Sequence, residues 1–465
     1  MISRNGVIGP HTTGCEIVTN DNRLLFETPA DTIEQLLWAA LKYNLDALWI
    51  APGSIVSRLA SSPQVVARMT TETPTIAVRA HCEEGKPTCI HAWAKNGTWE
   101  QRRTVRFFFP EYDERWQLQT VTNPIDLLNT VDLIEKGLGL PLDWSPGASG
   151  KATLKKLNQG VRAPWLRRVD FTGTPWLPTE EEQAEGITVP LAVNGTKKIF
   201  PDLTELDATE TMFLHIYDKS YAFGGACCSV NVGAGDPIHQ AYDDVRWDKK
   251  YPGIWKVGSG KWLYTPEVNY LISENYLTPT EIREAYFWPE YHQTMRSFAE
   301  LFWDLEIAAK DHPHARRAGK QIRSQGLGWL AMDTRQWRDN PEEEKISDFY
   351  RPDIWDAIVS EASVKMRYKM NQLWRKGYNA IWWNFDELGF LSNDPNPMTA
   401  VPIIDREGMG AFRHRYTLRV DDDILLAFAD GTSFPECHAL LLEKWRAQQR
   451  VYMDKTIMVP VVSNA

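Results

Sequence analysis

Two apolar, strand-like segments that each end in a carboxylate constrain the fold of this chain most strongly. Residues 211–217 (TMFLHIY) run into Asp218. Residues 379–385 (NAIWWNF) run into Asp386, which Glu387 follows. Segments this apolar are typical of buried strands. A lone Asp at a strand end is more often a turn or cap residue, but two such ends can expose carboxylates for a metal or for acid–base chemistry.

The composition describes an acidic globular protein. Its 465 residues are 43% hydrophobic and 24% charged, enough for two or three domains. The net charge of -10 argues against adhesion to nucleic acid by the whole surface and leaves local basic stripes. Six Cys are too few for a disulfide framework. With no signal peptide at Met1–Pro10 and no long apolar run, we expect a cytoplasmic protein without membrane contact.

The first half alternates strand and helix patterns. We expect a hairpin over Cys15–Glu27, a helix over Thr28–Tyr43, a strand over Leu45–Ala51 and a helix over Asn123–Gly137. A boundary is expected near residue 205. In the second half, helical patterns cover Pro279–Asp311, Arg316–Met332 and Asp353–Gly377. From Gly408 onward we expect short strands and one late helix, Glu436–Tyr452.

A cationic helix face lies between the two carboxylate segments. At helical spacing Arg316, Lys320 and Arg323 share one face, and Gly326 and Gly328 follow where a backbone could approach a ligand. Three cations suit a triphosphate. A solvated basic face that ends in a glycine cap is the alternative.

The second carboxylate segment has the pattern of a hairpin. The strand of residues 379–385 turns at Asp386 and Glu387 and returns as an apolar strand. Asp218 and Asp386, contributed by separate strands, are what a pair of Mg²⁺ ions needs in phosphoryl transfer.

Taken in order, these segments resemble the palm and fingers of family B DNA polymerases, most of all the protein-primed branch and degenerate relatives in linear replicons and mobile elements. The family's first motif is Asp-x-x-Ser-Leu-Tyr-Pro. Asp218 matches it, and Phe223 stands in the place of the Tyr that screens the sugar. Tyr221 and Ala222 replace Ser and Leu.

The second motif, Lys-x-x-x-Asn-Ser-x-Tyr-Gly, is matched by Lys320 and Gly328, while Ser324, Gln325 and Leu327 replace Asn, Ser and Tyr. The spacing of the motifs, 102 residues from Asp218 to Lys320 and 66 more to Asp386, adds to the resemblance.

The third motif, Tyr-x-Asp-Thr-Asp, aligns with Trp382, Asn384, Phe385 and Asp386, so its first Asp has become Asn. A further segment, REGMGAFRHRY, is similar to the family's Leu-Gly-x-Trp/Phe-Lys stretch and places Arg413 at the Lys that contacts primer or template.

The resemblance implies an α+β protein of three parts. Residues 1–205 would be an RNase-H-like, exonuclease-like domain, residues 206–420 a palm with helical fingers, and residues 421–465 a reduced thumb or C-terminal tail. The first part lacks the Asp-x-Glu set that a nuclease needs for two metals, because Asp21 and Asp113 lie in turn-like contexts. We therefore expect an inactive scaffold that grips single strands.

The resemblance also implies a reaction, a template-directed or protein-primed nucleotidyl transfer. Asp218 and Asp386 would be catalytic and hold Mg²⁺ or Mn²⁺. Nucleotide binding would fall to Lys320, helped by Arg316 and Arg323, with Ser324 and Phe223. The partners would be primer–template or single-stranded DNA, deoxynucleoside triphosphates and, for protein-primed synthesis, a priming protein.

Two alternatives stay open. The changes in the second and third motifs are also those of a catalytically decayed palm, which would act as a nucleic-acid-binding replication or defence factor. A glycoside hydrolase barrel is the other alternative, since residues 45–53 (LDALWIAPG) and 379–387 (NAIWWNFDE) read as buried strands that end at polar residues, and 20 Trp would suit sugar stacking.

Two further segments carry weaker signals. The basic segment Lys151–Arg168 could follow a phosphate backbone, with Trp165 for stacking, or be a solvated helix. Its nucleic-acid-binding candidates, beside Arg413, are Lys155, Lys156 and Arg167. In HCEEGKPTCIH, His81, Cys82, Cys89 and His91 could surround Zn²⁺, but a plain turn explains them better.

Overall fold

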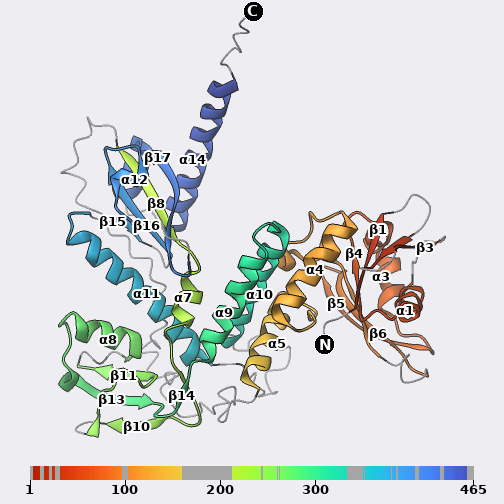
Figure 1. Ribbon diagram of the computed structural model, residues 1–465, viewed down its shortest axis with the longest axis horizontal. Coiled ribbons are helices and arrows are strands. Elements are labelled where there is room, and N and C mark those ends of the chain that lie inside the picture. The colour runs from red at the N-terminus through yellow and green to blue at the C-terminus, as the bar shows by residue number, and fades with distance from the viewer. Residues whose placement is uncertain are drawn as a thin grey trace, which may run out of the picture. The chain divides into compact units, whose positions relative to one another are not determined.

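The chain forms two compact units in a computed structural model (Figure 1). The first combines Met1–Asp170 with Ser297–Trp355, and the second combines Phe171–Arg296 with Asp356–Ala465. The structure describes residues 4–10, 15–19, 23–26, 32–96, 103–159, 212–241, 244–258, 260, 262–331, 349, 351–378, 380–383, 386–403, 408–429 and 434–457. The boundary expected near residue 205 lies outside these residues.

A seven-stranded mixed sheet forms the core of the first unit, with the strand order β3-β2-β1-β4-β7-β6-β5. Its strands are β1 (Asn5–Pro10), β2 (Cys15–Val18), β3 (Arg23–Phe26), β4 (Ala47–Ile50), β5 (Ile76–Glu83), β6 (Lys86–Ala94) and β7 (Val105–Phe108). β1 and β7 both run parallel to β4, and the remaining pairs are antiparallel. The hairpin and the strand expected in this region are therefore confirmed.

The helices of the first unit are α1 (Ile33–Lys42), α2 (Ile55–Leu59), α3 (Pro63–Thr70), η1 (Pro110–Tyr112), η2 (Glu114–Trp116), α4 (Pro124–Leu138), α5 (Pro146–Asn158), most of α9 (Thr294–Ala308), and α10 (Pro313–Ala331). Local chemistry sets where two of them begin. Thr32 and Gln35 form a capping box at α1. Asn123 accepts hydrogen bonds from two backbone N–H groups at the start of α4. Both helices were expected from the sequence, over Thr28–Tyr43 and Asn123–Gly137.

Two glycines allow α5 and α10 to pack closely. A Cβ built on Gly150 of α5 would lie 2.4 Å from the carbonyl oxygen of Ile322 and 2.5 Å from the Cα of Gly326, both on α10. Figure 1 shows the two helices side by side. The sequence predicts that a ligand approaches the backbone at Gly326, whereas the group that contacts Gly326 is another helix, α5. A Cβ on Gly328, by contrast, would meet nothing within 4 Å.

A four-stranded antiparallel sheet, which we call the β8 sheet, lies in the second unit with the order β15-β16-β8-β17. Its strands are β8 (Phe213–Lys219), β15 (Ala380–Trp383), β16 (Glu387–Ser392) and β17 (Phe412–Arg419). The two carboxylate-bearing segments identified in the sequence therefore contribute β8 and β15 to one sheet. β16, the return strand of the hairpin, lies between them.

Each face of the β8 sheet packs against different helices. Leu214, Ile216 and Tyr416 point to one face and share a core with α13 (Asp422–Ala429) and α14 (Phe434–Ile457). Tyr217, Leu388 and Phe390 point to the other face, where α11 (Pro352–Trp374) covers them. The alternation of side chains along a strand explains this division. After Gly408 the described residues contain one strand and two helices, instead of several short strands and one helix.

The rest of the second unit is a smaller sheet with the order β10-β13-β11-β12, together with the pair β14–β9. The elements are β9 (Val232–Gly233), β10 (Ile238–Ala241), β11 (Gly253–Val257), β12 (Trp262–Tyr264), β13 (Ile282–Phe287), β14 (Tyr291–His292), α7 (Ala222–Cys227), α8 (Thr265–Ser273), η5 (Pro279–Glu281) and α12 (Pro397–Ala400). The helix expected over Pro279–Asp311 is wrong in its first part. Residues 282–287 alternate buried and more exposed positions and pair as the strand β13.

The mixture of helices with mixed and antiparallel sheets confirms the expected combination of α and β structure in its general form. A (β/α)₈ barrel would need eight parallel strands in one closed sheet. The described strands form sheets of seven, four, two and four strands, so the glycoside hydrolase barrel is wrong for the described part of the chain. No helix within the described residues combines the length and apolar character needed to cross a bilayer.

The glycine contact between α5 and α10 gives a stability prediction. Replacing Gly150 with alanine is expected to lower the free energy of unfolding of the first unit by about 1–3 kcal/mol, because the added methyl overlaps the backbone of α10. Gly328→Ala, on α10 itself, is the matched control and is expected to be neutral or to stabilise by up to about 1 kcal/mol. Urea denaturation followed by circular dichroism measures both, and equal effects of the two substitutions would contradict the close packing.

Candidate functional site

A row of charged residues crosses three strands at one end of the β8 sheet. Asp218 on β8 lies directly opposite Glu387 on β16 and opposite Arg413 on β17. Residues directly opposite one another across antiparallel strands project to the same face. These three side chains therefore share the face that α13 and α14 cover. We call this set, together with Arg415 of β17, the carboxylate row.

Asp386 directly precedes Glu387, at the turn that leads into β16. Its carbonyl oxygen accepts a hydrogen bond from the backbone N–H of Lys219 at 2.6 Å, which continues the pairing of β16 with β8. In this register Asp386 lies opposite Lys219, so alternation assigns it to the face that α11 covers. The residue that the structure brings beside Asp218 on one face is Glu387. The two carboxylates predicted as a metal pair, Asp218 and Asp386, are therefore assigned to opposite faces of the sheet.

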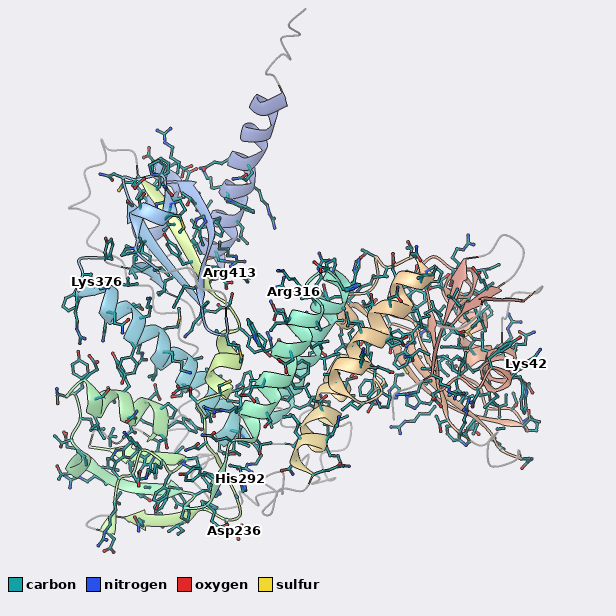
Figure 2. The ribbon with its side chains drawn as sticks, viewed as in Figure 1. Lys42, Asp236, His292, Arg316, Lys376 and Arg413 are labelled. Atoms are coloured by element: carbon teal, nitrogen blue, oxygen red, sulfur yellow. The ribbon has the colours of Figure 1, made fainter. Side chains whose placement is uncertain are left out.

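Both carboxylates of the row are ion-paired with arginines. Nε and Nη2 of Arg413 lie 2.9 and 2.8 Å from one oxygen of Asp218. Arg415 pairs with Glu387, whose side chain is only 4% exposed. His438 of α14 lies 3.9 Å from the other oxygen of Glu387. Burial, and secondarily the charge of Arg415, lowers the pKa of this histidine, which favours its neutral form. Figure 2 labels Arg413 at this end of the sheet.

Lysines gather on the opposite face of the same sheet end. Lys219 is buried between β8 and α11, and burial, helped by the nearby charges of Lys365 and Lys369, lowers its pKa to about 8. Lys219 and Lys369 lie 5.8 and 5.9 Å from the ring centre of Phe412. Lys365 donates to the carbonyl of Gly225 at 2.7 Å and to the hydroxyl of Ser229 at 2.6 Å.

The segment after Asp218 forms a tight turn into α7. Tyr221 adopts a left-handed backbone conformation with φ 59°. A Cβ on Gly224 would overlap the ring of Tyr221, so only glycine fits there. Phe223, the candidate sugar screen, lies in α7 and is partly buried. Local packing thus places Phe223 shortly after the strand that carries Asp218, in the same unit.

The predicted triphosphate residues lie on α10 in the first unit. Arg316, Lys320 and Ser324 form an exposed stripe along the helix. Arg316 is ion-paired with Glu306 of α9 at 2.7 Å, and Arg323, which is mostly buried, lies 3.8 Å from the same carboxylate. The structure groups these residues with one another and with α9. The cations that it groups with Asp218 in one unit are instead on β8, β17 and α11.

The predicted phosphate contacts near residue 155 have different surroundings. Lys156 donates to the carbonyl oxygens of Leu138 and Gly139 at 3.1 and 3.0 Å and so caps the C-terminus of α4. Lys155, its neighbour on α5, is exposed. Arg167 and Trp165 lie outside the described residues. The capping contacts give Lys156 a structural role that the sequence did not indicate.

The carboxylate row does not fit a pair of divalent ions. Among the described residues, no group of three or more His, Cys, Asp or Glu side chains is placed to hold a metal. The two carboxylates that share a face are already neutralised by two guanidinium groups. The zinc site considered for residues 81–91 is likewise absent from the described part of the chain. In the β5–β6 hairpin, Cys89 is buried and Cys82 is exposed.

Sequence reasoning missed Arg415, Lys219 and the pairing role of Glu387. Alternation along the strands could have indicated that Glu387, and not Asp386, shares the face of Asp218, but only once the strand register was known. Arg415 has no local signal, because its partner lies 28 residues earlier in the sequence on another strand.

Comparisons with known proteins find similar solved structures but no match to a family model or to a curated protein. Phi29 DNA polymerase complexed with primer-template DNA is similar over 90% of this chain and 84% of its own, at 11% identity and a TM-score of 0.48. Phi29 DNA polymerase complexed with primer-template DNA and incoming nucleotide substrates is similar over 90% of this chain and 85% of its own, at 10% identity and a TM-score of 0.48. The match to the family B DNA polymerase from the hyperthermophilic archaeon Pyrobaculum calidifontis covers 99% of this chain and 66% of that one, at 9% identity and a TM-score of 0.37.

The two neighbouring lysines of α5 give a prediction. Lys156→Ala is expected to destabilise the first unit by about 1 kcal/mol, because two carbonyl oxygens at the end of α4 lose their donor. Lys155→Ala is the control and is expected to change stability by less than about 0.5 kcal/mol. Thermal unfolding followed by circular dichroism compares the two, and equal losses would show that the capping contact contributes nothing specific.

Proposed function

We propose that the protein binds DNA, as primer–template or single strand, through a palm of the family B polymerase type. One observation carries this proposal. Three segments that resemble the family's motifs, around Asp218, Asp386 and Arg413, are 168 and 27 residues apart in the sequence, yet they come together in one antiparallel sheet. The cations at this end of the sheet supply charge that suits phosphates on an otherwise acidic chain.

The proposal extends to the three-part organisation expected from the sequence. An RNase-H-like domain up to residue 205 is supported by the mixed sheet, in which β2 and β3 form a hairpin beside β1 while β4 and β7 continue parallel to it. A palm from 206 to 420 with helical fingers, and a reduced thumb from 421, complete it. The nuclease-type domain would grip single strands without cutting them. Soluble, cytoplasmic action belongs to the same proposal.

Nucleotide binding is a second step of the proposal. Deoxynucleoside triphosphates would contact Lys320, Arg316 and Ser324, which share an exposed stripe of α10, with Arg323 as a further cation of the same helix. Phe223 would be the residue that screens the sugar. A priming protein would be a further partner in protein-primed synthesis. Lys155 and Arg167 would add contacts to the DNA backbone, as would Arg413, whose side chain is 54% exposed.

The proposed function has two versions, which differ in whether the protein catalyses nucleotidyl transfer or only binds nucleic acid. In the catalytic version, Asp218 and Asp386 would hold Mg²⁺ or Mn²⁺ and the protein would carry out nucleotidyl transfer. The ion pairs of Asp218 with Arg413 and of Glu387 with Arg415 favour the other version, in which a decayed palm holds nucleic acid in a replication or defence complex.

DNA binding is tested by fluorescence anisotropy with a labelled primer–template and a labelled single strand at several salt concentrations. We expect affinity to fall linearly with salt on logarithmic axes. Arg413→Ala is expected to lower affinity about tenfold and to reduce the salt slope by about one, because a phosphate contact is lost and Asp218 is left uncompensated. Arg419→Ala, at the other end of β17, is the matched control. The absence of binding to either DNA at about 50 mM salt would overturn the proposal.

Primer extension distinguishes the two versions. With Mg²⁺ or Mn²⁺ and all four deoxynucleotides, the decayed palm predicts no extension above a protein-free control. The catalytic version predicts extension that is lost in both Asp218→Ala and Asp386→Ala. Extension that survives both substitutions would exclude these residues as metal ligands.

A further inference from the structure

The carboxylate row is balanced in charge without any added ion. It contains two carboxylates, Asp218 and Glu387, and two guanidinium groups, Arg413 and Arg415, all at one end of the β8 sheet. Each carboxylate has its own arginine, both from β17. Asp218 is 16% exposed and Glu387 is 4% exposed, so neither carboxylate is mainly neutralised by water or salt.

A β-bulge in β17 places both arginines at the row. The pairing of β17 with β8 shifts between His414 and Tyr416, which leaves Arg415 as the extra residue. In a regular strand, Arg413 and Arg415 would face two different positions of β8 on the same side. The bulge keeps Arg415 out of the β17–β8 ladder and lets it reach Glu387 on the far strand β16.

A divalent cation would meet strong repulsion at this row. To reach Asp218 and Glu387 it must approach two guanidinium groups that already contact the same carboxylates. Like charges a few ångströms apart repel more strongly at partly buried positions than in water. His438 of α14 also lies near Glu387, and its side chain adds no negative charge to offset this repulsion.

We infer that Arg413 and Arg415 stand in place of divalent metal ions at the palm site, so that the carboxylate row is complete without metal and any DNA bound by the protein is held without divalent cations. The second half of this inference rests on the proposed DNA binding. The first half concerns the protein alone. The ligand that the row excludes is a hard divalent cation such as Mg²⁺ or Mn²⁺.

Mn²⁺ titration of the full chain, followed by the electron paramagnetic resonance signal of free Mn²⁺, tests the first half without DNA. The unaltered protein is expected to take up no Mn²⁺ at the row. The variant carrying Arg413→Gln and Arg415→Gln leaves two adjacent carboxylates and is expected to bind Mn²⁺ at least about tenfold more tightly. Arg419→Gln, which removes an arginine of the same strand outside the row, is expected to behave like the unaltered protein.

Two results would overturn the inference. One is Mn²⁺ binding by the unaltered protein that disappears in Glu387→Gln. The other is a folded double variant, by its circular dichroism, that gains no affinity for Mn²⁺. If the double variant does not fold, Arg413→Gln alone takes its place under the same two criteria, because Arg413 is half exposed and its loss opens no core cavity.

DNA affinity measured in EDTA and in Mg²⁺ tests the second half. We expect the two dissociation constants to agree within about twofold once ionic strength is matched. A loss of binding in EDTA would overturn the metal-independent site while leaving DNA binding itself intact. A failure to bind DNA under both conditions would instead contradict the proposed function, and the Mn²⁺ titration would still decide the first half.

Discussion

The pairing of β8 with β16 on one side and β17 on the other is the contact on which the second unit depends. It joins segments far apart in the sequence and fixes which side chains face α11 and which face α14. The hydrogen-bonded register alone brings Asp218, Glu387 and Arg413 into one line. A shift of one residue in either pair would place side chains that now share a face on opposite faces.

The sequence predicted elements well where the signal is local. The helix expected over Asn123–Gly137 forms as α4, and β2 and β3 pair as the expected hairpin. Prediction failed where pairing partners decide the outcome. Residues 282–287 were expected to be helical, but they form a strand because β10 and β11 flank them. Propensity is a weak guide when tertiary contacts supply the hydrogen bonds.

The candidate site shows the same division. Asp218 and the Asp386–Glu387 hairpin could be identified from apolar runs that end in carboxylates, and Arg413 from its resemblance to a motif. The choice of Glu387 as the neighbour of Asp218 depends on a register that no local pattern reports. The sequence predicted that a ligand would approach the backbone at Gly326, whereas the group that contacts it is Gly150 of α5. Identifying that contact requires the helix packing to be known.

The bulge at Arg415 also changes the phase of its strand. Before it, the odd-numbered Arg413 shares the face of α13 and α14, and beyond it the even-numbered Tyr416 and Leu418 do. If Arg415 paired in the ladder instead, Tyr416 and Leu418 would turn to the opposite face. A strand that lacked this one residue would, however, alternate regularly and keep the same core. The guanidinium at Glu387 therefore sits on the one residue of β17 whose removal would leave the packing against the C-terminal helices in register.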